Sequence, residues 1–517
     1  MRKAIQLLFL FLFTYLFFRA SYPLTSWIPV DLFLRADPLL ALTTTLSSKE
    51  FSAQALPAVV LIGVTVLFGR FFCGYICPLG TLLDFFDKII STKRTRFVEG
   101  LRRLKFYLLI GLIVASLTGA NLIYLCDPLI ILTRTYTILL YPLSIFLTNL
   151  SLDLLRPLAD YLGWVTLAYL NYSQPFFYMS LITGIIFTGV VALNLITPRF
   201  WCRYLCPLGA LLSLCSHFGI FRRVVTNRCN YCLKCKEMCP MGAIDDDPKK
   251  VKVRECVQCK TCTLICPQEA ISFKTLYSPF HEDIQTEIGI TRRGFLYSLS
   301  GGLVSSFFLF NTPLKQGRRD TLIRPPGAIP EEEFLNSCIR CSECMKVCIT
   351  NTLQPSLLEG GLEGLWTPKA DLRHAACEQT CNLCGKVCPT HAIRDLDLEE
   401  KKHAKIGTAV IIKEKCLVWE QDKVCLICDE QCPYNAIVFK SVEGFRRPFV
   451  IENKCNGCGF CEHKCPLEGE AAIVVKPLGE MRLKEGSYLE EAKRLQLELQ
   501  EDKGYDRFLF ENENSNK

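Results

Sequence analysis

The sequence predicts an α-helical transmembrane domain of about four spans with a duplicated hairpin, joined to α+β domains whose cysteines bind metal. Three observations predict this fold class: nearly all long apolar runs precede residue 220, 24 of the 30 cysteines follow it, and those cysteines recur at fixed short spacings. A chain of 517 residues has room for several domains. It is too long and too apolar to be a small secreted scaffold held by disulfides, so metal ligation better explains its cysteine content.

The charge balance excludes one large class of function. The chain has 59 basic and 51 acidic residues, a formal charge of +8, and no basic run interleaved with aromatic residues. A nucleic-acid partner is therefore not expected. No GxGxxG motif follows a strand-like run and no CxxCH motif occurs, so neither a dinucleotide cofactor nor a c-type haem is expected.

Four apolar stretches are long enough, or nearly long enough, to cross a bilayer, which takes about 20 residues. They are residues 4–18, 53–69, 104–125 and 176–196. The loops after the second and fourth stretches are rich in Lys and Arg, which predicts that both loops are cytoplasmic and that the N-terminus lies inside. The basic residues of the second of these loops are Arg199, Arg203, Arg222 and Arg223.

Two apolar segments leave the number of spans open. No small-x-small cleavage pattern follows Phe18, so the first stretch is predicted to be an uncleaved span rather than a signal peptide. The run from 128 to 150 is apolar enough to span, but Arg134 and Pro142 interrupt it. It could lie on the outer face or contribute a pair of extra spans, and either choice keeps both basic loops on the inner side.

The membrane half contains a repeat with the frame CxYxCPLGxLL. Its copies place Cys73 and Cys77 after the second apolar stretch, and Cys202 and Cys206 after the fourth. A four-residue spacing puts both thiols of a copy on one helical face, and thiolate clusters select soft metals and iron–sulfur centres. The repeat therefore predicts that four thiols can meet at a further metal or redox centre. Ordinary buried thiols are the alternative, as they are for the two cysteines outside any motif, Cys126 and Cys215.

Two motifs of the form CxxCxxCxxxCP follow the membrane half. Their cysteines are Cys229, Cys232, Cys235 and Cys239, then Cys256, Cys259, Cys262 and Cys266. This is the spacing of bacterial two-cluster ferredoxins, in which three close thiolates hold one [4Fe–4S] cluster and the fourth cysteine ligates the other. Cys266 would then complete the first cluster and Cys239 the second. A zinc site, with two pairs separated by a longer loop, fits poorly.

Four further cysteine groups bring the predicted total to six [4Fe–4S] clusters. Their cysteines are Cys338, Cys341, Cys344 and Cys348; Cys377, Cys381, Cys384 and Cys388; Cys416, Cys425, Cys428 and Cys432; and Cys455, Cys458, Cys461 and Cys465. The first three of these groups depart from the strict pattern in one spacing or in the residue after the last cysteine. The spacing does not show which of the four groups pair with each other.

The segment between the two cysteine-rich regions reads TRRGFLYSLSGG. Arg292 and Arg293 precede a weakly hydrophobic run from Phe295 to Phe310, as in a twin-arginine export signal. Such a signal would export the domain already folded and loaded, which protects its cysteines from oxidation. The alternative is a basic flank before a fifth span. No small-x-small site follows Phe310, so the run is predicted to remain as an anchor.

Together these motifs resemble two known families. The first 275 residues or so resemble NapH-type membrane ferredoxin subunits, and residues 288–475 resemble NapG-type (MauM/NapG) ferredoxins, so the chain looks like a fusion of the two. The resemblance implies a quinol dehydrogenase of the cytoplasmic membrane that passes electrons to a periplasmic reductase or cytochrome, as in nitrate-reductase systems. The implied parts are 1–222 (transmembrane), 223–275 (cytoplasmic ferredoxin), 288–315 (signal or anchor), 330–475 (periplasmic ferredoxin) and 476–517 (charged helical tail).

Several functional alternatives remain. A metal-reducing maturation factor for a respiratory oxidase also joins CxxxCP motifs to a two-cluster ferredoxin, although four further clusters argue against it. Electron transfer in the reverse direction, into the quinone pool, and a redox sensor without turnover are others. For the quinone itself, Arg203, Tyr204 and His217 lie near the second CxxxCP motif, but each has a stronger structural interpretation. The catalytic residues are therefore unknown at this level.

Overall fold

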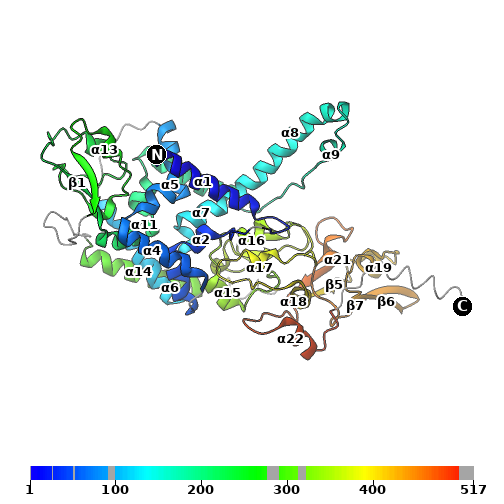
Figure 1. Ribbon diagram of the computed structural model, residues 1–517. Coiled ribbons are helices and arrows are strands. Elements are labelled where there is room, and N and C mark those ends of the chain that lie inside the picture. Colours follow the sequence, from blue (N-terminus) through cyan, green and yellow to red (C-terminus); the bar gives the residue numbers. More distant parts are fainter. Residues whose placement is uncertain are drawn as a thin grey trace.

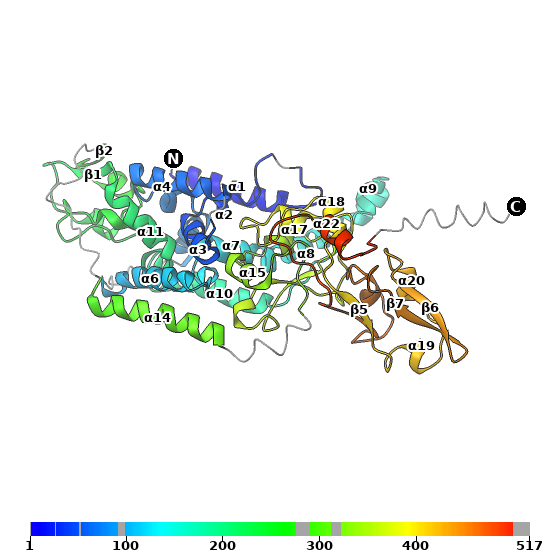
Figure 2. The ribbon, with the colours of Figure 1, turned by 90° about the horizontal axis from the view of Figure 1, so that it is seen from below.

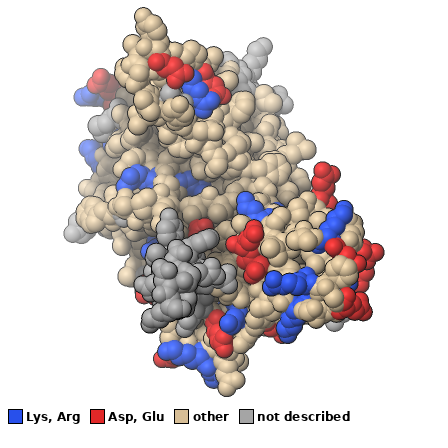
Figure 3. Space-filling view, turned by 90° about the vertical axis from the view of Figure 1, so that its right-hand side faces the viewer, with Lys and Arg blue, Asp and Glu red and all other residues tan. Residues whose placement is uncertain are grey.

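The structure is a computed structural model that describes residues 2–25, 27–50, 53–90, 99–275, 290–311 and 322–499. A helical half lies in the middle of the molecule, and a cysteine-rich region lies at each end of it (Figure 1). Below, the end that carries β1 and α13 is called the inner module, and the end that carries α15 to α22 is called the outer region. Figure 3 looks onto the outer region, where basic and acidic side chains are interspersed.

Five helices run between the two cysteine-rich ends. They are α1 (Arg2–Arg19), α4 (Leu56–Phe68), α6 (Leu104–Leu117), α10 (Ser180–Ala192) and α14 (Arg292–Asn311). α1 begins beside Asp84 near the inner module and ends where Ala20 accepts a hydrogen bond from Lys346 of the outer region. The twin-arginine helix α14 lies along α6 (Figure 2), with Gly302 so close to Gly111 that a Cβ atom would meet its carbonyl oxygen at 2.7 Å.

Three of these helices are shorter than the predicted spans. α4, α6 and α10 have 13, 14 and 13 residues, about 20 Å each at 1.5 Å per residue. Within the described ranges, one helical stretch is both long and apolar enough to cross a membrane, and it is Pro128–Tyr161, which contains the run that the sequence leaves open. The four-span topology therefore stays a prediction. The basic loop residues from 91 to 98 and the segment from 312 to 321 lie outside the described residues.

Short helices fill the centre of the helical half. They are α2 (Leu32–Arg35), α3 (Pro38–Ser48), α5 (Pro78–Ile90), α7 (Pro128–Thr135) and α11 (Pro207–Cys215). Asp37 caps α3 and Asp127 caps α7 by accepting two backbone N–H bonds each, and both begin the sequence frame DPLxxLT. The helical half is thus duplicated over more residues than the CxYxCPLG frame alone. Beyond α7, α8 (Tyr141–Tyr161) projects away from the body and leads to α9 (Val165–Ala168) (Figure 1).

Three ferredoxin-like modules share one strand arrangement. In each, a strand before the first cysteine motif pairs antiparallel with a strand after the second. The pairs are β1 (Phe221–Val225) with β2 (Ile271–Thr275), β5 (Thr408–Ile411) with β8 (Ile473–Lys476), and a single bridge between Ala328 and Ile393. The remaining pairs are β3 (Leu353–Pro355) with β4 (Pro368–Ala370), and β6 (Ile437–Val442) with β7 (Phe445–Val450).

The helices of the modules are short turns around the cysteines. In the inner module they are α12 (Lys234–Glu237) and α13 (Thr261–Ile265). In the outer region they are α15 (Glu331–Ser337), α16 (Glu343–Lys346), α17 (Leu383–Lys386), α18 (Leu398–His403), α19 (Leu417–Glu420), α20 (Ile427–Glu430), α21 (Phe460–His463) and α22 (Tyr488–Arg494). Within the predicted charged helical tail, residues 488–494 form α22, whose Tyr488 and Ala492 are buried and which packs against α18.

Buried charges fasten the inner module to the helical half. Glu255 lies 2.5 Å from Lys105 and 3.4 Å from Arg70, and all three side chains are buried. Arg203 donates to the carbonyl oxygen of Pro240 from a nearly fully buried position. Arg199, Arg222 and Arg223, which belong to the same predicted cytoplasmic loop, are buried too. Each of the four arginines donates to a carboxylate or carbonyl oxygen inside the protein.

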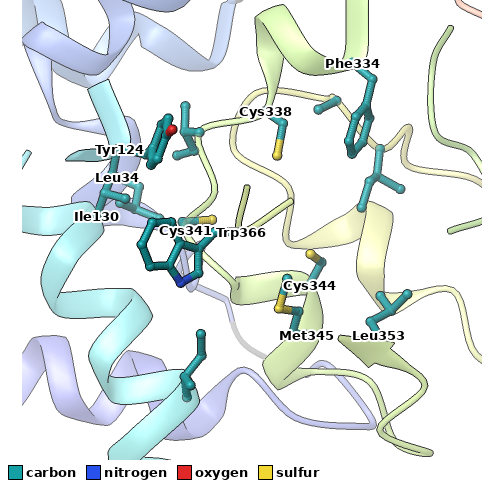
Figure 4. Packing of buried hydrophobic residues seen from close by; sticks show 14 of the residues in the cluster. Leu34, Tyr124, Ile130, Phe334, Cys338, Cys341, Cys344, Met345, Leu353 and Trp366 are labelled. Atoms are coloured by element: carbon teal, nitrogen blue, oxygen red, sulfur yellow. The ribbon is translucent and has the colours of Figure 1, made fainter. Parts of the chain in front are cut away.

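The outer region docks closely onto the other end of the helical half. Arg340 donates a 2.6 Å hydrogen bond to the carbonyl oxygen of Asn121, and its guanidinium lies 4.1 Å from the ring centroid of Tyr124. Figure 4 shows Trp366 and Cys341 facing Tyr124 and Ile130 across this junction. The hydrophobic core is continuous through it, so the two parts form one packed unit.

Candidate metal centres

Cysteines from two successive motifs line each cysteine cavity. In the inner module, a cavity of about 370 Å³ is lined by Cys239 of the first motif and by Cys256, Cys259 and Cys262 of the second. This is the crossed arrangement that the ferredoxin spacing predicts. It places the last cysteine of one motif with the first three cysteines of the other.

The outer region repeats the crossed arrangement in its first module. A cavity of about 460 Å³ is lined by Cys348 together with Cys377, Cys381 and Cys384. The thiols of Cys338, Cys341 and Cys344 all interact electrostatically with that of Cys388. The groups that begin at Cys338 and Cys377 are therefore partners, which the spacing left open.

The second outer module is built in the same way. A cavity of about 450 Å³ is lined by cysteines of the Cys416 group and by one cysteine of the next group, namely Cys416, Cys425, Cys428 and Cys465. A cavity of about 330 Å³ is lined by the complementary set, Cys432, Cys455, Cys458 and Cys461. The eight-residue gap after Cys416 and the three-residue gap after Cys377 thus do not prevent these cysteines from reaching a shared site.

Backbone conformation around the strict CxxCxxC motifs fits an anionic cluster. In all four such motifs, both residues that flank the middle cysteine have positive φ. The pairs are Tyr231 and Leu233, Gln258 and Lys260, Arg340 and Ser342, and Gly457 and Gly459. Six of the eight are not glycine, so this conformation is strained and has to be held by its surroundings. Alternating right- and left-handed residues turn successive N–H groups toward one concavity, which suits a negatively charged cluster.

A backbone N–H donates to the sulfur of most of the last cysteines. Ala243 donates to Cys239 at 3.3 Å, and Ala270 donates to Cys266 at 3.4 Å. Ala436 makes the equivalent bond to Cys432 at 3.3 Å. Hydrogen bonds of this kind stabilise a thiolate ligand and tune a cluster. The sequence carries a signal for them that cysteine spacing alone misses, because CPxxAI recurs at 239, 266, 388 and 432.

Buried cations surround the set formed by Cys338, Cys341, Cys344 and Cys388. Arg134 comes from α7 of the helical half, is 1% exposed, and lies 4.2 Å from the ring centroid of Trp366. Arg324, also 1% exposed, pairs with Glu331. Arg340, which interacts with Cys338, completes the group. Buried charges need partners, so these cations fit a cluster that carries net negative charge.

The four CxxxCP cysteines are brought together as the repeat predicts. The thiols of Cys77 and Cys206 each interact electrostatically with those of Cys73 and Cys202. Within the described ranges, no three His, Cys, Asp or Glu side chains converge tightly enough to hold a single metal ion. The crossed cysteine sets have the same property, and a cubane, whose four irons are bound by separate thiolates, needs such wider spacing.

The residues near the second CxxxCP motif do not form a quinone site that can be recognised. Arg203 is bound to the inner module, and Tyr204 is buried with its ring 4.8 Å from that of Phe200. His217 packs beside Phe218. Arg292 and Arg293 begin α14 and are exposed.

Comparison with known protein families recognises the repeat of the helical half. A family model described as a 4Fe-4S binding domain matches residues 55–96 and again residues 179–225. The two matches contain the two CxxxCP motifs, so the same family model recognises both copies of the repeat. No solved structure shows a significant match to the chain.

Curated relatives match about 30% of the chain. The methylamine utilization ferredoxin-type protein MauM of Methylorubrum extorquens is 39% identical over 164 residues, which are 30% of this chain and 72% of that protein. The ferredoxin-type protein NapG of Escherichia coli is 37% identical over 167 residues, 30% of this chain and 71% of that protein. The ferredoxin-type protein NapF of Escherichia coli is 30% identical over 152 residues, 29% of this chain and 84% of that protein.

Proposed function

Because the chain belongs to the family of ferredoxin-type proteins that includes MauM and NapG, we propose that it oxidises a membrane quinol and passes the electrons to a periplasmic reductase. Iron–sulfur electron transfer of the ferredoxin type is the function that these relatives and the family model support. When bound, each [4Fe–4S] cluster accepts or releases one electron. In this proposal the chain holds six such clusters, five in the crossed sets described above and one at Cys229, Cys232, Cys235 and Cys266.

A membrane location is the second part of the proposal. Large apolar side chains are exposed on the helices that connect the two cysteine-rich ends: Phe11 is 68% exposed, Val60 66%, Leu181 75% and Phe307 64%. Soluble monomers rarely expose apolar surface on this scale, whereas a bilayer would cover it. The inner module then lies in the cytoplasm and the outer region in the periplasm. Residues before about 275 play the part of a NapH-type subunit and the outer region that of a NapG-type subunit, fused in one chain.

The observation that carries the proposal is the placement of ferredoxin modules at both ends of one helical body. A soluble ferredoxin needs no such body, and a membrane reductase that works on one side needs no second module. The helix α14 supports a retained anchor, since it packs along α6 with a 2.7 Å hydrogen bond from Thr118 to Ser306. Exported clusters stay connected to the membrane half in this arrangement.

The proposal is tested by anaerobic reduction with quinol. The whole chain is purified in detergent, its iron and acid-labile sulfide are counted, and a quinol analogue is added while cluster reduction is followed by electron paramagnetic resonance. Rapid reduction of several clusters is expected. Loaded clusters that stay oxidised with quinol but are reduced by a low-potential donor would remove the dehydrogenase assignment.

The maturation-factor alternative is separated from the proposal in cells. A strain that lacks the protein is expected to lose quinol-dependent reduction of a terminal acceptor such as nitrate while keeping a copper-loaded oxidase. An unaffected acceptor reduction together with loss of oxidase copper would favour the alternative and reject the proposal.

A further inference from the structure

The two CxxxCP motifs form one symmetric site in the helical half, where it meets the inner module. Each motif begins with a π-helical turn, Phe72–Ile76 in one copy and Trp201–Leu205 in the other, and each ends where a cysteine caps the next helix. Gly209 donates its N–H to the sulfur of Cys206 at 3.2 Å, and Gly80 donates to Cys77 in the same way. Both copies therefore present a sulfur at a helix N-terminus, where the helix dipole favours a thiolate.

Each copy of the repeat also supplies a buried arginine to the opposite copy. Arg70 and Arg199 both precede their first cysteine by three residues, and both are fully buried. The Nη2 atom of Arg70 lies 2.8 Å from the position that a Cβ atom on Gly209 would take. Arg199 donates to the carbonyl oxygens of Cys73 at 3.1 Å and Gly80 at 3.3 Å. Two crossed guanidinium groups thus enclose the four thiols.

Charges around the four thiols do not cancel among themselves. Glu255 is shared by Arg70 and Lys105, at 3.4 and 2.5 Å, so one carboxylate faces two cations. Asp84 is likewise shared by Arg199 and Arg2, both at 2.6 Å. Arg199 also interacts with Asp87, so the excess of positive charge lies on the Arg70 side. Four neutral thiols would leave that buried charge uncompensated, which is costly, whereas four thiolates around a [4Fe–4S] core carry two net negative charges.

The site also lies between the inner and outer cysteine sets. On one side, Tyr75 donates to the carbonyl oxygen of Gln258 at 3.1 Å, beside the inner cavity. On the other side, Cys206 interacts electrostatically with Asp127, the first residue before α7. α7 has 8 residues, about 12 Å, and Arg134 near its other end interacts with Cys341 of the outer region. The path from this site to the outer region therefore follows one short helix, which is shorter than a bilayer core of about 30 Å.

We propose that Cys73, Cys77, Cys202 and Cys206 hold a seventh [4Fe–4S] cluster, with Arg70 and Arg199, one from each repeat, as its counter-ions. This inference rests on the proposed function for its role, since it supplies the redox centre between the cytoplasmic and periplasmic modules. A single zinc ion is disfavoured because no three ligands converge on one point within the described ranges.

Cysteine variants test the centre directly. The full chain is purified anaerobically with the substitutions Cys77→Ser and Cys206→Ser combined, and compared with a matched control that combines Cys126→Ser and Cys215→Ser. The first variant is expected to lose about one seventh of its iron and sulfide in equal amounts, with one electron paramagnetic resonance signal, and the control is expected to lose neither. Equal iron in both variants, or one zinc per chain lost only from the first, would overturn the proposal.

A measurement on the unmodified chain keeps the test valid if the variant misfolds. Under anaerobic native conditions, mass spectrometry of thiol alkylation is expected to find all four cysteines protected until iron is chelated. Alkylation before chelation, or disulfides among the four, would reject the centre.

The role of the two arginines is tested by a redox titration of variants. Arg70→Gln and Arg199→Gln are expected to lower the midpoint potential of this one signal, because a lost positive charge favours the oxidised cluster, while Arg70→Lys restores most of it and Arg156→Gln on α8 leaves it unchanged. An unchanged potential in both glutamine variants would remove their assigned role.

The two proposals fail separately. If quinol reduces no cluster but the cysteine variant still loses one, the quinol assignment fails and the centre stands. If quinol reduces the six other clusters and the variant keeps its iron, the centre alone is rejected.

Discussion

The backbone N–H of Cys377 donates a 2.9 Å hydrogen bond to the carbonyl oxygen of Cys458. These cysteines line cavities in different modules, so the bond joins the two outer modules at their cysteine sites. The four outer sets consequently follow one another in a line. The set with Cys338 lies against the helical half, and the set with Cys416 lies at the far end, near α19 in Figure 1.

Crossed ligation predicts which cluster a single cysteine supports. Cys348→Ser is expected to expose Cys377, Cys381 and Cys384 to alkylation, because Cys348 lines their cavity, while the three cysteines of its own motif stay protected. Mass spectrometry of alkylated peptides measures this. Cys126→Ser is the control and should expose neither group. Exposure of Cys338, Cys341 and Cys344 instead would contradict the crossed pairing.

Arg134 is expected to set the potential of the first outer cluster. Its guanidinium is buried and interacts electrostatically with Cys341, so Arg134→Gln removes a positive charge that stabilises the reduced cluster. The midpoint potential of one signal in a redox titration should fall, and Arg134→Lys should fall less. Arg156→Gln, on the exposed part of α8, should change nothing. If both Arg134 variants titrate like the unmodified chain, Arg134 does not act on the cluster.

The ion pair at Glu255 is expected to hold the inner module in place. Burial alone would raise the pKa of Glu255, but Lys105 and Arg70 lower it below its usual value, so the carboxylate is charged. Glu255→Gln leaves Arg70 and Lys105 buried without a carboxylate partner, so it should lower the free energy of unfolding by about 3–5 kcal/mol. Faster hydrogen exchange across residues 221–275 would report the loss. Glu470→Gln, which breaks an exposed pair with Lys415, should leave hydrogen exchange of these residues unchanged.

Glu331 is expected to make the outer region sensitive to acid. Burial raises its pKa, but Arg324 and Arg482 lower it more, so the folded pKa lies below the usual 4.5. The stabilisation is therefore complete above about pH 4.5 and is lost as pH falls through the folded value. Hydrogen exchange of α15 should quicken over that range, and Glu331→Gln should be fast already at pH 7. An equal pH response in both proteins would show that another group is responsible.

The sequence predicts the cysteine sets well and their charged surroundings poorly. Four strict CxxCxxC motifs are recognisable because local spacing dictates them. The pairing of the Cys338 group with the Cys377 group depends on which modules pack together, which spacing does not contain. Arg199 and Arg203 look like loop anchors because an isolated arginine near an apolar run usually is one. Only the packed structure shows the carbonyl and carboxylate groups that they bind.

Helix lengths were the other part that the sequence could not fix. Apolar composition predicts α1 closely, but α4, α6 and α10 end at Phe68, Leu117 and Ala192, before the ends of the predicted runs. The DPLxxLT frame at Asp37 and Asp127 was available as a second repeat signal. It shows that the central helices, as well as the cysteines, are duplicated.

Vectorial electron transfer is the central claim, and oriented membrane vesicles test it most directly. Vesicles with the periplasmic face outward receive a quinol analogue and a membrane-impermeant electron acceptor in the outer medium. The account predicts rapid reduction of this acceptor, and its loss in the variant that combines Cys77→Ser and Cys206→Ser. Reduction of an acceptor enclosed inside the vesicles, with none outside, would contradict it.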